Sequence, residues 1–148
     1  MNAVMTSVHR TETGLSREQY AAIADFRFQL RRFLAFSESA AMRAGLPPQQ
    51  HQALLAIAGH RADEPPSVGM LARHLLIAPN TAAELVGRME QGGLVTKEAA
   101  AEDRRRTELA LTPKAAKLLR TLTVAHLEEL RELEPALVRA LGGIGPAG

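Results

Sequence analysis

The chain has 148 residues, the length of one ordinary domain or of two small lobes that share a core. Hydrophobic residues make up 46% and charged residues 23%, a globular rather than a disordered composition. There is no cysteine, which excludes disulfides, thiolate metal sites and cysteine-based catalysis or redox sensing. No apolar run approaches the roughly 18 residues of a membrane span, and the first residues carry no signal-peptide pattern, so we expect a cytoplasmic protein.

The charge is distributed unevenly along the chain. The formal net charge is only +2, yet residues 88–120 carry 8 basic and 5 acidic side chains. Such a surplus is often just a solvated surface, so its meaning depends on the structure of this stretch.

Apolar spacing predicts a long first helix that begins at Ser16 and ends before Gly45 and the following prolines. A helix of this length in so small a domain suggests that its exposed apolar side packs against a partner. A second helix is expected over residues 48–60.

Two short helices joined by a tight turn are predicted next. Ser67 is the expected N-cap of a helix over residues 68–75. Pro79 takes a first-turn position of a helix over residues 79–91, which ends at two glycines.

The sequence period then changes to that of strands. Residues 94–98 and 107–111 are compatible with a β-hairpin whose tip, residues 99–106, is small and basic. Thr112 and Pro113 are the expected N-cap and first residue of a last long helix.

We expect this last helix to break near residues 132–134, because Pro135 cannot donate a backbone hydrogen bond. A short terminal helix through Leu141 and a frayed tail over residues 142–148 would follow.

The order helix, turn, helix and hairpin is that of a helix-turn-helix followed by a wing. The second helix would enter the major groove, where Asn80 suits adenine, Thr81 a base or phosphate, and Glu84 the cytosine amino group. The basic wing tip would reach phosphates or a narrow minor groove. The candidate DNA-binding residues are Asn80, Thr81, Glu84, Arg88, Asp103, Arg104, Arg105 and Arg106.

Several motifs in this region resemble the MarR family of winged-helix transcription regulators. They are L-A-R-H-L at residues 71–75, A-P-N-T-A-A-E-L-V-G-R-M-E at 78–90, G-L-V at 93–95 and E-D-R-R-R-T-E-L-A-L-T at 102–112. The family's wing pattern, an aspartate, one residue, an arginine and a strand ending in Leu-Thr, is matched by Asp103, Arg105 and Leu111-Thr112. The flanking helices resemble the family more loosely.

The resemblance implies a mainly α fold with a small β-hairpin wing, built as a winged helix-turn-helix domain plus a helical dimerisation lobe. The expected parts are a disordered tail over residues 1–15, dimerisation helices over 16–46 and 113–141, the DNA-binding domain over 47–112 and a flexible tail over 142–148. The protein would be a homodimer on a pseudo-palindromic double-stranded DNA operator.

The resemblance also assigns roles within the wing. Arg105 would enter the minor groove, held by an ion pair with Asp103, while Arg104 and Arg106 would contact phosphates or stay solvated. The chain departs from the family at Ala78, which replaces the usual hydroxyl cap, and at residues 82–84, where Ala-Ala-Glu replaces frequent Ser, Thr or Arg. These departures bear on the operator sequence more than on DNA binding itself.

Aromatic residues of the first helix admit two readings. They could be core and dimer packing, or some could line a cleft where MarR-type proteins often bind small aromatic or anionic effectors. The effector candidates are Tyr20, Phe26, Arg27 and Arg31. The guanidinium group of Arg27 or Arg31 could hold a carboxylate.

Two functions therefore remain open. The first is a dimeric DNA-binding regulator, a repressor released by an effector, since the chain has no added activation domain. The second is a winged-helix module that binds a protein instead, favoured by the donor-poor Ala82-Ala83-Glu84. The five histidines show no metal-ligand spacing, and no catalytic signature appears, so neither a cofactor, a metal site nor an enzyme is expected.

Overall fold

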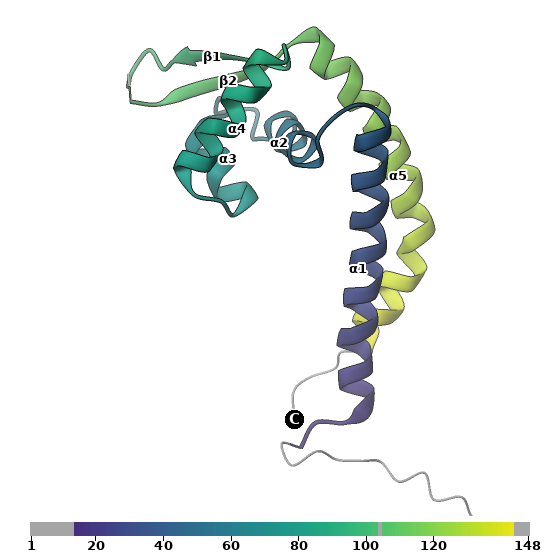
Figure 1. Ribbon diagram of the computed structural model, residues 1–148. Coiled ribbons are helices and arrows are strands. Elements are labelled where there is room, and N and C mark those ends of the chain that lie inside the picture. Colours follow the sequence, from purple (N-terminus) through teal and green to yellow (C-terminus); the bar gives the residue numbers. More distant parts are fainter. Residues whose placement is uncertain (1–13, 104, 144–148) are drawn as a thin grey trace, which may run out of the picture. The chain divides into compact units, whose positions relative to one another are not determined.

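The computed structural model describes residues 14–103 and 105–143. Within these residues the predicted order of helices and strands is observed, and the fold is mainly helical with one antiparallel hairpin (Figure 1). The elements are α1 (Arg17–Arg43), α2 (Pro48–Ala58), α3 (Val68–Leu75), α4 (Pro79–Gln91), β1 (Val95–Ala99), β2 (Thr107–Leu111) and α5 (Pro113–Gly142).

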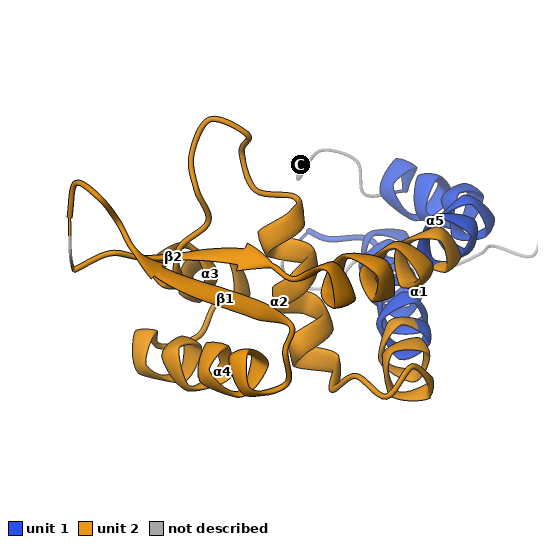
Figure 2. Ribbon diagram, turned by 90° about the horizontal axis from the view of Figure 1, so that it is seen from above, with its two compact units in different colours: residues 1–36, 126–148 blue, residues 37–125 orange. Residues whose placement is uncertain are grey.

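The chain divides into two compact units (Figure 2). The first contains the described parts of residues 1–36 and 126–148, and the second contains residues 37–125. Helices α1 and α5 each contribute residues to both units. No helix within the described ranges combines the length and apolar character needed to cross a membrane.

The core of the second unit lies where α2, α3, α4 and the hairpin meet. Its largest fully buried side chains are Leu54, Leu71, Val86, Met89 and Val95. Complete burial of such a side chain stabilises a fold by roughly 1.5–3 kcal/mol. This packing therefore fixes α4 and the hairpin relative to α2 and α3.

Local capping chemistry sets the helix boundaries. The Ser67 hydroxyl accepts a hydrogen bond from the Met70 N–H at 3.1 Å at the start of α3. Thr112 does the same for the Ala115 N–H at 3.2 Å at the start of α5. Helix α4 begins with Pro79 and receives no side-chain cap from Ala78, as its missing hydroxyl requires.

The hairpin is antiparallel, with Val95 opposite Leu111 and Ala99 opposite Thr107. β1 begins one residue later than expected, because Leu94 completes the end of α4. Its N–H donates to the Met89 carbonyl at 2.9 Å. A residue bound in this way closes the helix instead of starting the strand.

The segment before α3 adds to the edge of the hairpin. Ser67 forms an isolated bridge with Glu108, and the Leu109 N–H donates to the Pro66 carbonyl at 2.8 Å. β2 is therefore held on both edges at this point.

The predicted break near Pro135 is wrong, because α5 runs without interruption from Pro113 to Gly142. Proline removes one N–H, the donor to the carbonyl of residue 131, and both positions are exposed, so water can satisfy that carbonyl. Leu133 and Ala140 are both buried on either side of it. Burial on both sides holds the helix together across the missing bond.

The turn between α3 and α4 contains a strained residue. Leu76 has φ 56° and ψ 43°, in the left-handed region, and its residue surface is 92% exposed. A left-handed conformation costs an L-residue with a Cβ about 1–2 kcal/mol. An exposed leucine gains no burial that would offset this cost.

We expect Leu76→Gly to raise the free energy of unfolding by about 0.5–1 kcal/mol. Relief of the backbone strain stabilises the folded state, and the greater conformational entropy of glycine in the unfolded chain offsets part of this gain. Urea denaturation would measure it. Leu55→Gly is the matched control, since Leu55 is an exposed leucine inside α2, and it should destabilise by about 1 kcal/mol. Equal destabilisation by both variants would contradict the strain argument.

Candidate nucleic-acid interface

Helix α4 presents a polar face outward and an apolar face inward. The side chains predicted to contact DNA from this helix, Asn80, Thr81, Glu84 and Arg88, are all exposed. Ala82, Leu85, Val86 and Met89 are buried on the other side. The helical period thus separates the two sets as the sequence predicts, and the exposed set is free to meet a ligand.

The beginning of α4 is also open. Pro79 occupies its first turn, and residues 78–81 are exposed. The first N–H groups of a helix lack partners within the helix and form its positive end, which favours phosphate oxygens.

In the wing loop, residues 100–106, backbone hydrogen bonds link the described residues to one another. The Ala100 N–H donates to the Arg106 carbonyl at 2.9 Å, and the Arg106 N–H donates to the Asp103 carbonyl at 3.0 Å. The Asp103 carboxylate accepts from the backbone N–H of Arg105 at 2.9 Å. The expected side-chain ion pair between Asp103 and Arg105 is thus replaced by a turn contact, which leaves the exposed Arg105 guanidinium available. Arg104 lies outside the described residues.

Arg106 behaves differently from the expected phosphate contact or solvated side chain. Its Nη2 lies 2.5 Å from Oε1 of Glu64 and 3.4 Å from the Pro65 carbonyl, in the loop between α2 and α3. Nε2 of His60 is 3.9 Å from the other Glu64 oxygen. The hydrogen bond and the charge of Arg106 lower the pKa of Glu64 below its ordinary value.

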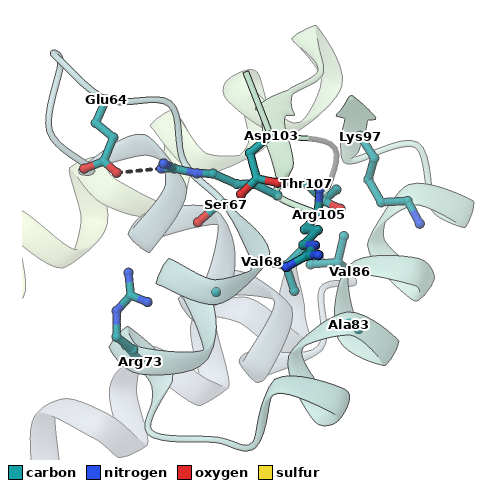
Figure 3. Close-up of a pocket in the computed structure, with 12 residues that line it drawn as sticks. Glu64, Ser67, Val68, Arg73, Ala83, Val86, Lys97, Asp103, Arg105 and Thr107 are labelled. Atoms are coloured by element: carbon teal, nitrogen blue, oxygen red, sulfur yellow. Dashed lines mark hydrogen bonds and ion pairs between the residues drawn. The ribbon is translucent and has the colours of Figure 1, made fainter. Parts of the chain in front are cut away.

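A hollow of about 560 Å³ lies between the wing, α3 and α4 (Figure 3). Figure 3 shows Asp103, Arg105 and Thr107 on its wing side and Ala83 on the α4 side. Its charged lining residues are Arg73, Lys97, Arg105, Arg106, Glu64 and Asp103. Four cations against two anions make this surface attractive to polyanions.

Two of these cations escaped the sequence analysis. Arg73 is exposed in the last turn of α3, and Lys97 projects from β1, where it also lies 3.4 Å from Glu90. The positions of Arg73 and Lys97 beside the wing depend on which face of α3 turns toward the hairpin and on which face of β1 carries Lys97. Neither is known until the two elements have packed together.

The four effector candidates are all residues of α1 in the first unit. Tyr20, Arg27 and Arg31 are exposed, and Phe26 is half-buried. Their role stays a prediction. Within residues 14–103 and 105–143, no three His, Asp or Glu side chains come together as a metal-binding group.

The tight turn between α3 and α4, the outward face of α4 and the adjoining hairpin define a winged helix-turn-helix domain. Residues 44–106 match the family model of the MarR family. The resemblance drawn from the motifs is confirmed over this segment, and the fold beyond it is that of MarR family structures. No curated protein matches the sequence significantly.

Solved structures of MarR family regulators superpose on most of the chain. MepR, a transcription regulator of the Staphylococcus aureus multidrug efflux pump MepA, does so with a TM-score of 0.67 at 17% identity, over 85% of this chain and 98% of that one. A complex of S. aureus MepR with DNA gives 0.61 at 22% identity, over 81% and 82%. AbsC from Streptomyces coelicolor gives 0.66 at 20% identity, over 82% and 78%.

The Glu64–Arg106 contact predicts a pH dependence. Because the pKa of Glu64 is lower in the folded state than its ordinary 4.5, its stabilising contribution is present above that value and is lost as the pH falls through the lowered pKa. We expect the contact to persist at neutral and weakly acidic pH. An NMR titration of the Glu64 carboxyl carbon would check it, and a midpoint at or above 4.5 would contradict it.

Proposed function

We propose that this chain is a homodimeric, sequence-specific DNA-binding transcription regulator that represses its target and is released by a small-molecule effector. The observation that carries the proposal is the basic hollow of a MarR-type domain, which lies between Arg105 of the wing and Ala83 of α4. The outward side chains of α4, Asn80, Thr81, Glu84 and Arg88, do not line this hollow. S. aureus MepR, which has a similar fold, has been solved in complex with DNA, and this supports a DNA-binding role for the present chain.

Each exposed side chain has a role that its chemistry suits. Asn80 would pair with adenine, Glu84 would accept from a cytosine amino group, and Thr81 and Arg88 would contact bases or phosphates. Arg105 would enter the minor groove, where a narrow groove concentrates negative potential. Arg73 and Lys97 would add phosphate contacts at the edge of the hollow.

Dimerisation is supported by apolar side chains that a single chain leaves exposed. In the first unit these are Tyr20, Ile23, Phe28, Leu30 and Leu34 from α1, and Leu127, Leu130, Val138 and Leu141 from α5. An apolar hollow of about 340 Å³ lies along this part of α5. Large exposed apolar patches mark interaction sites. We therefore assign residues 16–46 and 113–141 to dimerisation and residues 47–112 to DNA binding.

Release would follow from a shift between two dimer conformations. An effector that binds better to a spacing of the winged domains that does not fit the operator would lower DNA affinity. Tyr20, Phe26, Arg27 and Arg31 are the candidate contacts for an aromatic or anionic effector.

We expect wild-type protein to enrich a pseudo-palindromic site from random and genomic duplex DNA, with affinity that falls steeply as salt rises. Arg105→Ala should lose about 1–3 kcal/mol of binding free energy for that site. Arg61→Ala is the control and should bind like wild type, because it removes an exposed arginine that lies outside the wing, α4 and the dimerisation helices and pairs with Asp63.

The result that would overturn the proposal is weak, unselective binding by wild type that Arg105→Ala leaves unchanged. The winged domain would then be a protein-binding module, in agreement with its donor-poor α4 face.

A charge on the exposed apolar face should separate the subunits. Val138 is 60% exposed, so Val138→Glu should leave the single chain folded while it places a carboxylate in the apolar surface. Sedimentation at several concentrations should show a shift from dimer to monomer and a loss of operator binding. Gln49→Glu adds the same charge at an exposed position on α2 and should remain dimeric. Unchanged assembly in both variants would place the interface elsewhere.

A further inference from the structure

The wing loop is connected to a distant part of the chain through one charged contact. In the described part of residues 100–106, the hydrogen bonds of Ala100, Asp103 and Arg105 stay within the loop. Arg106 instead reaches back across 42 positions of sequence to Glu64, and also approaches the Pro65 carbonyl. Figure 3 draws this ion pair as a dashed line from Glu64.

The backbone segment that follows Glu64 is restrained by prolines and by hydrogen bonds. The prolines that follow Glu64 restrict the backbone, and the second of them, Pro66, accepts the hydrogen bond from Leu109 of β2. Ser67 adds the bridge to Glu108 and caps α3. The carboxylate is therefore attached to a segment that is itself tied to the hairpin and to α3.

The contact is too exposed to matter much for global stability. Glu64 and Arg106 side chains are 42% and 38% exposed, and exposed ion pairs typically contribute little to the free energy of unfolding. Its consequence is local, because Arg106 adjoins Arg105. Holding Arg106 in place limits the freedom of the loop that carries Arg105, so less entropy is lost when Arg105 enters a groove.

We propose that Glu64 is a positioning residue for DNA binding, which holds the wing through Arg106 so that Arg105 is presented to the minor groove. This proposal rests on the proposed function. The carboxylate of Glu64 would then favour DNA binding, although its negative charge alone should oppose the binding of a polyanion.

That conflict of sign makes the proposal testable. If Glu64 only placed a negative charge beside the DNA and withheld Arg106 from the phosphates, Glu64→Gln would raise operator affinity. If Glu64 positions the wing, Glu64→Gln lowers the affinity by roughly 2- to 10-fold for each wing. In this variant, side chains of the wing that Glu64 holds in place in the wild type must be ordered when DNA binds.

The matched control is Asp63→Asn. Asp63 is the neighbouring carboxylate, is exposed and pairs with Arg61 at 2.7 Å in its own loop instead of with the wing. It removes the same charge at nearly the same place. Operator affinity should be unchanged or slightly raised in this variant and lowered in Glu64→Gln, as measured by fluorescence anisotropy at several salt concentrations. Equal or tighter binding by Glu64→Gln relative to Asp63→Asn overturns the proposal.

The salt dependence and a charge exchange separate positioning from phosphate contact. Arg106→Gln should weaken binding about as much as Glu64→Gln while the slope of log affinity against log salt stays that of wild type. A phosphate contact would instead reduce the slope by about 1 for each subunit. The double variant Glu64→Arg with Arg106→Glu should recover affinity relative to either charge reversal alone. A reduced slope in Arg106→Gln, or no recovery in the exchange, overturns the proposal.

Hydrogen exchange distinguishes a failure of this inference from a failure of the proposed function. In Glu64→Gln the Ala100 and Arg106 amides, whose hydrogen bonds close the loop, should exchange faster, while those of Asp63→Asn should not. If wild type selects no operator, the proposed function fails whatever these amides do. If wild type selects one and the amides and affinity of Glu64→Gln match Asp63→Asn, the proposed function stands and the positioning role fails.

Discussion

The arrangement of the second unit depends on the junction where α4 ends and the hairpin begins. Met89 and Val95 are buried on either side of this junction, and Leu94 joins them through its hydrogen bond to the Met89 carbonyl. The other side of the hairpin is fastened at the same place, because the Thr112 hydroxyl donates to the Gly93 carbonyl at 2.6 Å and its N–H donates to the Leu94 carbonyl at 3.1 Å. One small buried region therefore sets the direction of both the helix and the wing.

This junction shapes how the protein would read DNA. A fixed α4 presents Asn80, Thr81, Glu84 and Arg88, but Ala83 lies among them and Glu84 carries a negative charge, so the helix offers few donors to base edges. A larger share of DNA recognition would then fall to the wing. The loop at its tip extends beyond the last strand pair, Ala99 with Thr107, where the junction no longer constrains it. The Glu64–Arg106 contact supplies a constraint at that point.

Much of this could be predicted because the chemistry is local. Ser67, Pro79, Gly93 and Thr112 act on backbone groups within a few residues, so the ends of α3, α4 and α5 follow from the residues themselves. The contact of Arg106 with Glu64 could not be predicted in this way, since the partners are 42 positions apart and meet only after the hairpin has paired with the segment before α3. The break predicted at Pro135 is wrong for the opposite reason. The prediction used only the local effect of proline on the helix, and the burial of Leu133 and Ala140 outweighs this effect.

The few donors on α4 and the constraint on the wing together indicate where the sequence specificity of a dimer would come from. Two winged domains joined by their terminal helices would contact successive grooves, so the dimer, and not the contacts of either wing, would set the spacing of half-sites. Within each half-site, a donor-poor α4 distinguishes fewer base pairs than a helix rich in arginine and serine. An arginine held at a fixed place beside the groove responds to groove width instead, because a narrow minor groove attracts a cation more strongly. Positioning Arg105 would therefore contribute to specificity, since a freely moving wing would find a phosphate on any sequence.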